Sequence, residues 1–261
     1  MKVLFFGDVY GKAGRTALLT ALSGLKEEFK PDFIIANVEN LADGKGVTEK
    51  TLHPLIKAGI DAFTGGNHLW DRAESLDYLK KQTQIAKPMN YPASTPGMPF
   101  VKVQKEELIV GVICLCGQIY MPPCDNPFAA LEHFIDSEEP CMPVILDFHA
   151  ESTSEKRAMA WFADGKLGAI LGTHTHIQTA DEEILPLGTA YLTDVGMTGA
   201  HDSVIGVRKN IIVEKLHSAI PCRYESADLG LQINAVLIEF DNQSNMAVRI
   251  TRIKRDVALD K

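Results

Sequence analysis

The first eight residues, Met1-Lys-Val-Leu-Phe-Phe-Gly-Asp8, determine how the rest of the chain is interpreted. Residues 3–6 form a short run of β-branched and aromatic side chains, which is typical of a buried strand. The run ends at Gly7, so we expect the carboxylate of Asp8 just past the carboxyl end of that strand. In open α/β sheets, this edge is where ligands bind.

Four later apolar runs end in the same way, each beside a side chain that can bind a metal. They are residues 33–38 before Glu39 and Asn40, 62–64 before Asn67 and His68, 144–148 before His149, and 169–171 before His174 and His176. Strands and helix-like stretches alternate in steps of roughly thirty residues, which predicts βαβ units with parallel strands. The sequence therefore indicates a two-metal hydrolytic site at the shared carboxyl edge.

The types of donor at these strand ends favour transition metals. His174 and His176 lie two residues apart, so period-two geometry places both on one face. Carboxylate, imidazole and amide donors without thiolates suit manganese, iron, cobalt or zinc, and not a structural thiolate zinc site. Each residue alone has a simpler interpretation, because a histidine at a strand end is commonly a hydrogen-bonded structural residue. Their equivalent positions favour the metal site.

Composition limits the classes of partner. The formal net charge of −8 opposes a broad basic face, so we expect no stable complex with duplex nucleic acid. Five cysteines without a Cys-x-x-Cys pair do not resemble a disulfide framework. The amino-terminal apolar run is short and interrupted by Asp8, and no stretch is long enough to span a membrane. We expect a cytoplasmic protein without a signal peptide.

The organisation of the chain favours one α/β domain over residues 1–261. Periodicity predicts helices over residues 14–29, 48–58, 71–81, 127–134 and 152–163, the last opening with a capping box of Ser152 and Glu155. The glycines at positions 7, 11 and 14 match neither a Walker loop nor a dinucleotide motif, and we interpret them as turn formers near the site. Residues 200–230, partly helical and mixed in charge, are the candidate for a small lid.

Several motifs in the chain resemble a known superfamily. Gly7-Asp8, Gly66-Asn67-His68, the strand-terminal His149 and Gly172-Thr-His-Thr-His176 resemble, in order and spacing, the motifs of calcineurin-like metallophosphoesterases. Within that superfamily, Gly7-Asp-Val-Tyr-Gly-Lys, Ala36-Asn-Val-Glu-Asn40 and Thr193-Asp-Val-Gly-Met-Thr-Gly199 resemble the bacterial YmdB type. The resemblance implies a sandwich of mixed β-sheets flanked by helices. It also implies a phosphodiesterase acting on 2′,3′-cyclic and 3′,5′-cyclic nucleotides.

The resemblance implies a ligand set for two metal ions. One ion takes Asp8, Glu39, Asn40 and His176, and the other takes Glu39, Asn67, His149 and His174. Iron or manganese is the expected metal, with zinc or cobalt as alternatives, and a bridging hydroxide is the expected nucleophile. The sequence departs from the superfamily at two positions: Tyr10 replaces a histidine, and Glu39 replaces the bridging aspartate, with Asn40 filling the vacated position.

By the same resemblance, His68 is the general acid that protonates the leaving sugar oxygen. Its other interpretation is a hydrogen-bonding residue beside the ligands. The carboxylate that often follows this histidine is Leu69 here, so Asp71 and Asp43 are the candidates for orienting the imidazole. Lys12, Arg15, Arg208 and Lys209 are candidates for substrate phosphate or for the solvated surface. Thr198 and Trp70 are candidates for the pocket wall or the core.

Two other classes of function stay open. The same site could hydrolyse phosphomonoesters, phosphoproteins or RNA ends, since only the pocket walls distinguish these substrates. A regulatory protein could instead use the site to sense a nucleotide, although such a sensor has no need of His68 as an acid. The sequence leaves the oligomeric state open, with a homo-oligomer among the alternatives.

Overall fold

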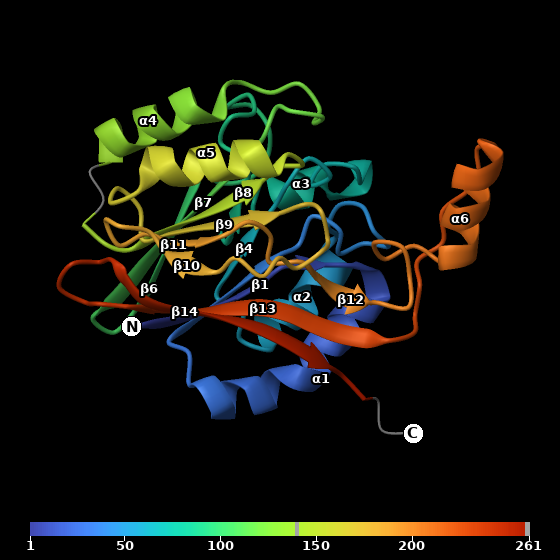
Figure 1. The fold of residues 1–261 in the computed structure, drawn as a ribbon, viewed down its shortest axis with the longest axis horizontal. Coiled ribbons are helices and arrows are strands. Elements are labelled where there is room, and N and C mark those ends of the chain that lie inside the picture. Colours follow the sequence, from blue (N-terminus) through green and yellow to red (C-terminus); the bar gives the residue numbers. More distant parts are fainter. Residues whose placement is uncertain (139–140, 259–261) are drawn as a thin grey trace.

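Two β-sheets pack face to face between two layers of helices in the computed structural model, which describes residues 1–138 and 141–258 (Figure 1). The helices are α1 (Gly11–Phe29), α2 (Glu49–Lys57), the 3₁₀ turn η1 (Ala73–Ser75), α3 (Leu76–Leu79), α4 (Pro127–Glu138), α5 (Thr153–Ala163) and α6 (Lys209–Ser218). In Figure 1, α4 and α5 cover one sheet, whereas α1 and α2 lie beyond the other. This α/β sandwich confirms the predicted fold class.

The first sheet carries the amino-terminal half of the predicted site. Its strands run in the order β2 (Asp8–Val9), β12 (Met197–Ala200), β13 (Leu231–Phe240), β1 (Lys2–Phe6), β3 (Phe33–Asn37), β4 (Ala62–Thr64) and β5 (Ile85–Ala86), and β14 (Ala247–Asp256) also pairs with β13. Strands β1, β3, β4 and β5 are parallel. Their carboxyl ends therefore share one edge, where Asp8, Glu39 and Asn67 follow.

The second sheet carries the remaining predicted ligands. Its order is β10 (Glu183–Ile184), β11 (Ala190–Leu192), β9 (Ala169–Thr173), β8 (Val144–His149), β7 (Leu108–Cys116) and β6 (Phe100–Lys105). Strands β7, β8, β9 and β11 are parallel, and His149 is in register with Thr173. His149 is thus level with the start of the loop that carries His174 and His176.

Alternate residues of the central strands fill the core on both sides of the first sheet. Val3 and Phe5 of β1 lie between the sheets, where Ile145 and Leu171 of the second sheet belong to the same cluster. Leu4 and Phe6 point the other way, into the cluster that α1 and α2 complete. A third cluster joins α4 and α5 to the outer face of the second sheet. This burial fixes the two carboxyl edges side by side.

Two local predictions were wrong. The helix expected over residues 71–81 is reduced to η1 and α3, because residues 68–72 contact the site loops. Arg72, for example, donates to the carbonyl of Ala42. The capping box at Ser152 does not form, since the Ser152 hydroxyl pairs with Ser154. Glu155 instead accepts hydrogen bonds from the loop amides of Gln118 and Ile119.

Residues 200–230 leave the first sheet after β12 and return to it at β13. They include α6, which projects from the body of the molecule (Figure 1). Val207 and Ile212 of this segment pack against Tyr10. The predicted domain, residues 1–261, includes 139, 140 and 259–261, which lie outside the described residues. Among the described helices, none has the length and apolar character needed to cross a membrane.

Candidate metal centre

The structure brings the seven predicted ligands together at the adjoining carboxyl edges of the two sheets. One group surrounds the Nε2 atom of His149, which lies 3.1 Å from Glu39 Oε1, 3.1 Å from Asn67 Oδ1 and 3.1 Å from His174 Nδ1. Glu39, His149 and His174 each offer one donor atom, and the three atoms lie within 4.8 Å of one another. These four residues are the set predicted for one of the two metals.

A second group surrounds the Nε2 atom of His176. This nitrogen lies 3.2 Å from Asn40 Oδ1 and 3.9 Å from Asp8 Oδ1. The same oxygen of Asp8 is 3.9 Å from Nδ1 of His149, so Asp8 lies between the two histidines. The motif resemblance assigns Asp8, Asn40 and His176 to the other metal, together with Glu39, whose carboxylate contacts the first group.

The donors fit a positively charged occupant. Asp8 is fully buried, and its Oδ1 has no hydrogen-bond partner among the described residues. Its Oδ2 accepts a hydrogen bond from the backbone N–H of His174 at 3.2 Å. A buried carboxylate oxygen without a partner is costly, and a metal ion would satisfy it. Four oxygen donors and three imidazoles also match the ligand preferences of first-row transition metals.

The packing of the predicted metal ligands requires a glycine at position 66. A Cβ atom there would collide with Oε2 of Glu39 and would lie 2.6 Å from Nε2 of His149. The absence of a side chain lets both donors approach the loop after β4. Gly7 has a similar role beside Asp8, because a Cβ atom there would collide with the carbonyl oxygen of Gly196. Gly7 thus permits a close backbone contact, whereas Gly14, also predicted as a turn former, lies within α1.

Burial and neighbouring charges shift the pKa values of these groups in different directions. Burial raises the pKa of Asp8. Burial opposes ionisation of Glu39 too, but the neighbouring His149 holds the pKa of Glu39 at about 2. Burial alone would lower the pKa of His149, whereas the carboxylates of Glu39 and Asp8 raise it to about 9. Burial and the charge of His149 lower the pKa of His174 to about 3. Without a metal, His149 is therefore charged and His174 neutral at pH 7.

A buried hydrogen-bond chain lies behind His149 that the sequence analysis did not find. Nδ1 of His149 is 2.8 Å from Oγ1 of Thr173, which donates to Oδ1 of Asp147 at 2.6 Å. The other carboxylate oxygen of Asp147 accepts hydrogen bonds from Thr64 and Asn37 of the first sheet. Burial raises the pKa of Asp147 to about 6. Such partners fix the orientation of metal-binding imidazoles.

The other two predicted histidine ligands are also held through their second nitrogen. Nε2 of His174 is 3.2 Å from the carboxylate of Glu151, another residue that the sequence analysis missed. Nδ1 of His176 is 2.9 Å from the carbonyl oxygen of Ile205. Tyr10 packs edge-on against the ring of His176, with centroids 5.6 Å apart. Tyr10 thus forms a wall of the site where the superfamily pattern has a histidine.

His68 lies at the rim of the site. Its backbone N–H donates to Oε2 of Glu39 at 2.9 Å, and its Nδ1 is 2.8 Å from Oδ2 of Asp71. Asp71 therefore contacts the imidazole, whereas Asp43 approaches Arg72. Leu69 is fully buried in the core beneath α1 and α2. The side chain of His68 is about one-third exposed, at 30%.

The donors open onto a cavity of about 360 Å³. Its walls contain Tyr10, Glu39, Asn40, Gly44, Lys45, His68, Glu151, His174, Thr175, His176, Ile205, Val207 and Tyr224. The polar side comes from the predicted ligands and His68. Tyr10, Ile205, Val207 and Tyr224 form an apolar and aromatic side, three of them from the 200–230 segment. The cavity can therefore accept a ligand with an anionic and an apolar part.

The remaining candidate residues have other partners and do not line this cavity in the described structure. Arg15 donates to the carbonyl of Leu41, Arg208 pairs with Glu225, and Lys209 pairs with Asp202. Thr198 is buried and donates to the carbonyl of Asn234. Trp70 donates to the carbonyl of Pro96 and packs on Tyr91, and Lys12 lines a neighbouring cavity.

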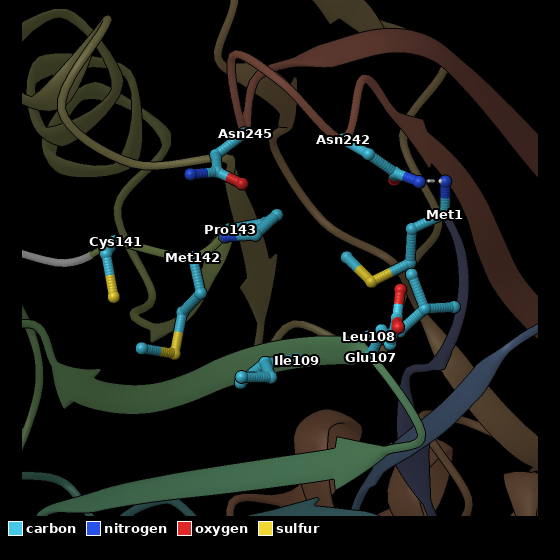
Figure 2. A pocket seen from close by; sticks show the side chains of 9 residues that line it. All are labelled: Met1, Glu107, Leu108, Ile109, Cys141, Met142, Pro143, Asn242 and Asn245. Carbon is cyan, nitrogen blue, oxygen red and sulfur yellow. Dashed lines mark hydrogen bonds between the residues drawn. The ribbon is translucent and has the colours of Figure 1, made fainter.

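A smaller cavity of about 150 Å³ lies at the opposite ends of the strands (Figure 2). Met1, Leu108 and Pro143, which precede or begin β1, β7 and β8, line it, together with Asn242 and Asn245. The amino group of Met1 donates to Oδ1 of Asn242 at 2.9 Å. Its lining includes a single carboxylate, from Glu107, and no histidine. The chemistry of this protein is therefore assigned to the other edge.

The fold and the convergent donors define the class of metallophosphoesterases. The chain belongs to the YmdB-like protein family, whose model matches residues 4–253. It is 44% identical, over 97% of its length and 96% of the relative, to the 2′,3′-cyclic-nucleotide 2′-phosphodiesterase of Bacillus subtilis (strain 168). The protein is thus an enzyme of the phosphodiesterase and phosphatase type that binds metal.

Solved structures agree with this assignment. A hypothetical protein from Thermus thermophilus superimposes with a TM-score of 0.92 at 36% identity, covering 98% of this chain and 99% of that one. A novel phosphatase from Mycoplasma pneumoniae gives 0.93 at 33% identity, covering 98% and 93%. The NAD nucleotidase of Haemophilus influenzae is 13% identical with a TM-score of 0.60, covering 98% of this chain and 56% of that chain, which shows a shared fold alone.

Proposed function

We propose that this protein hydrolyses the phosphodiester bond of cyclic nucleotides, 2′,3′-cyclic, 3′,5′-cyclic or both, at a dinuclear metal site. One observation supports the proposal above all others. Seven oxygen and nitrogen donors from five strand ends converge in two groups, one around Nε2 of His149 and the other around Nε2 of His176. The 2′,3′-cyclic-nucleotide 2′-phosphodiesterase activity named for the Bacillus subtilis relative supports the same substrate class.

The proposed ligands divide as the two groups do. Asp8, Glu39, Asn40 and His176 would hold one metal ion, and Glu39, Asn67, His149 and His174 would hold the other. Two bound ions supply positive charge that neutralises the phosphate and lowers the pKa of the attacking water. The anionic charge of the substrate otherwise opposes attack by hydroxide. We propose iron or manganese as the native metal, with zinc or cobalt as alternatives.

His68 is proposed as the proton donor to the leaving sugar oxygen. A ribose alkoxide is a poor leaving group, so a proton donor placed beside it accelerates its departure. His68 lies at the rim of the cavity, and Asp71 holds its Nδ1 atom. Its Nε2 atom then remains available to the substrate. The apolar wall formed by Tyr10, Val207 and Tyr224 suits the nucleoside part of the substrate.

Three broader expectations accompany the proposal. The substrate is a small nucleotide and not duplex nucleic acid, in keeping with the net charge of −8. A cytoplasmic location and a single domain with residues 200–230 as a lid remain predictions from the sequence. A homo-oligomer stays open, and size-exclusion chromatography with light scattering would determine the oligomeric state.

The test is an assay of the purified protein, with its metal content measured, on four substrates. These are 2′,3′-cyclic AMP, 3′,5′-cyclic AMP, bis-p-nitrophenyl phosphate and p-nitrophenyl phosphate. We expect hydrolysis of the diesters to exceed that of the monoester. Dominant monoester cleavage would contradict the proposed substrate class. Binding of cyclic nucleotide by the metal-loaded protein without turnover would instead favour a sensor.

The substitution Glu39→Gln is the matching test of the site. It should abolish turnover and lower metal occupancy, because Glu39 is proposed to contact both ions. Glu182→Gln serves as the control, since Glu182 forms a partly buried ion pair with Arg252 of β14 and does not line the cavity. Full activity of Glu39→Gln with unchanged metal content would contradict the proposal.

A further inference from the structure

The loop that carries His174 and His176 has an unusual backbone. Both residues have positive φ angles, 97° for His174 and 65° for His176. Side chains other than glycine rarely adopt this left-handed region, and such conformations persist only where surrounding contacts enforce them. The two imidazoles reach their separate groups of donors because of this conformation. Some part of the structure must therefore hold the loop.

A buried lysine contacts this loop from behind. Lys156 of α5 is fully buried, and its Nζ donates to the carbonyl oxygen of Thr173 at 2.8 Å. The same Nζ donates to Oδ2 of Asp194 at 2.6 Å. Gly172 lets the lysine stem pass, because a Cβ atom there would lie 2.9 Å from Cδ of Lys156. An ammonium group buried in this way is retained only with full hydrogen bonding.

Asp194 completes the connection to the loop. Its Oδ2 accepts a hydrogen bond from the backbone N–H of Thr175 at 3.1 Å, and its Oδ1 accepts one from Gly196 at 2.8 Å. The carbonyl of Gly196 packs on Gly7, directly before Asp8. The next residue, Met197, donates its N–H to the carbonyl of His176 at 3.2 Å. Lys156 and Asp194 thus contact the peptide groups on both sides of His174 and reach toward His176.

We propose that Lys156 and Asp194 are positioning residues for the metal centre. Their ion pair holds the loop in the left-handed conformation that directs His174 and His176 to their donors. This inference rests on the proposed function, because it takes both histidines as metal ligands. Neither residue lines the cavity, so both act through the loop and not on the substrate. The pair links α5 and the segment after β11 to the ligand loop.

The test uses the double variant Lys156→Met with Asp194→Asn, measured on the full chain. This change removes both charges together and so leaves no unpaired buried charge, while it retains the approximate side-chain volumes. We expect the dissociation constant for Mn²⁺, from competition with a chelator, to rise about 10- to 100-fold. Turnover of 2′,3′-cyclic AMP at limiting Mn²⁺ should fall, and excess Mn²⁺ should restore part of it.

The matched control is Arg157→Met with Glu183→Gln. Arg157 follows Lys156 on the same helix, and its ion pair with Glu183 is half-exposed and away from the loop. This control should leave the Mn²⁺ dissociation constant unchanged. If Lys156 had a purely structural role, the double variant would have a lower thermal unfolding temperature, but its folded form would bind Mn²⁺ with unchanged affinity. If the double variant does not fold, Lys156→Gln with Asp194→Asn, which also leaves no unpaired charge but keeps an amide donor at position 156, is measured in the same way.

The outcomes separate this inference from the proposed function. Wild-type protein that binds no Mn²⁺ and hydrolyses no phosphodiester would contradict the proposed function itself. Wild-type protein that does both, beside a folded variant with the same Mn²⁺ affinity and turnover, would overturn the positioning role alone. A weakened affinity in the variant and an unchanged one in the control would support it.

Discussion

The Nδ1 atom of His68 lies 2.8 Å from the Oδ2 atom of Asp71, three residues further along the chain. Leu69 occupies the position directly after the histidine, where the superfamily pattern often has a carboxylate. The side chain of Leu69 is buried in the core. Asp71 therefore takes over the contact to the imidazole from a different place in the loop. A carboxylate at Nδ1 fixes the tautomer and directs Nε2 away from it.

Replacing Asp71 should affect the proposed acid without removing the metals. We expect Asp71→Asn to lower kcat for 2′,3′-cyclic AMP about tenfold, an order-of-magnitude figure for a misaligned general acid. Metal content should be unchanged. The control is Asp77→Asn, since Asp77 forms an exposed pair with Lys80 at the same spacing of three residues. Equal losses of kcat in the two variants would contradict the orienting role of Asp71.

Replacing His68 tests the acid itself. His68→Ala should keep its metals and lose about 10²- to 10⁴-fold in kcat on cyclic nucleotides, whose leaving oxygen needs a proton. Bis-p-nitrophenyl phosphate has a good leaving group and should lose far less. The measurement is kcat of the variant and of the wild type on both substrates, with the metal content of each protein determined. Equal losses on both would contradict the proposed role.

Gly66 offers a test of the ligand geometry. Gly66→Ala should lower Mn²⁺ occupancy and abolish turnover, because its Cβ would occupy the space of Glu39 Oε2. The control is Gly24→Ala in α1, where a Cβ atom has nothing within 4 Å. That control should leave activity intact and stabilise the helix by about 0.5–1 kcal/mol. An active, metal-loaded Gly66→Ala enzyme would show that these donors do not converge as described.

The hydrogen-bond chain behind His149 predicts an effect of Thr173. Thr173→Val removes the hydroxyl between His149 and Asp147, and we expect Mn²⁺ affinity to fall about 10- to 100-fold. Thr189→Val is the control, since its buried hydroxyl donates to the carbonyl of Leu167 just before β11 and β9 begin, at the ends of these strands opposite the site. Both variants should lose stability, and only the first should lose metal affinity.

The pKa of His149 predicts how metal binding depends on pH. Because the nearby carboxylates raise it to about 9 in the metal-free protein, a metal must displace a proton at pH 7. The apparent Mn²⁺ affinity should therefore rise about tenfold per pH unit up to about pH 9. In the metal-free protein, the stabilisation from the charged His149 is present below pH 6.5 and lost as the pH rises through about 9.

Calorimetry in buffers with different ionisation enthalpies measures the released proton directly. We expect about one proton per protein from His149 at pH 7. His174, with its pKa near 3, should contribute none. An affinity that does not change between pH 7 and pH 9 would contradict this distribution of protons.

The sequence contained enough information for the fold class and for the convergence of the seven predicted side chains at one edge. Residues 33–38 and 144–148 are apolar runs that end in Glu39 and His149, and the structure places both ends at one edge. This succeeded because parallel strands align their carboxyl ends, so position along each strand predicts position at the site. The motif resemblance added which donor types belong together.

The supporting residues could not be predicted in the same way. Asp147 lies inside an apolar strand, and its partners Thr64 and Asn37 come from the other sheet. Sequence periodicity describes one element at a time and does not reveal which side chains meet between two sheets. The role of Lys156 could not be predicted either, because a lysine on a helix is ordinarily solvated. This lysine is instead buried and donates to the loop that carries His174 and His176.

The most direct test of the central claim is anomalous X-ray diffraction from crystals loaded with Mn²⁺. We predict two manganese peaks, one beside Asp8, Asn40 and His176, the other beside Asn67, His149 and His174. The carboxylate of Glu39 should lie between the two peaks. A single peak in a closed shell, or manganese bound elsewhere while these donors remain hydrogen-bonded to one another, would contradict the account.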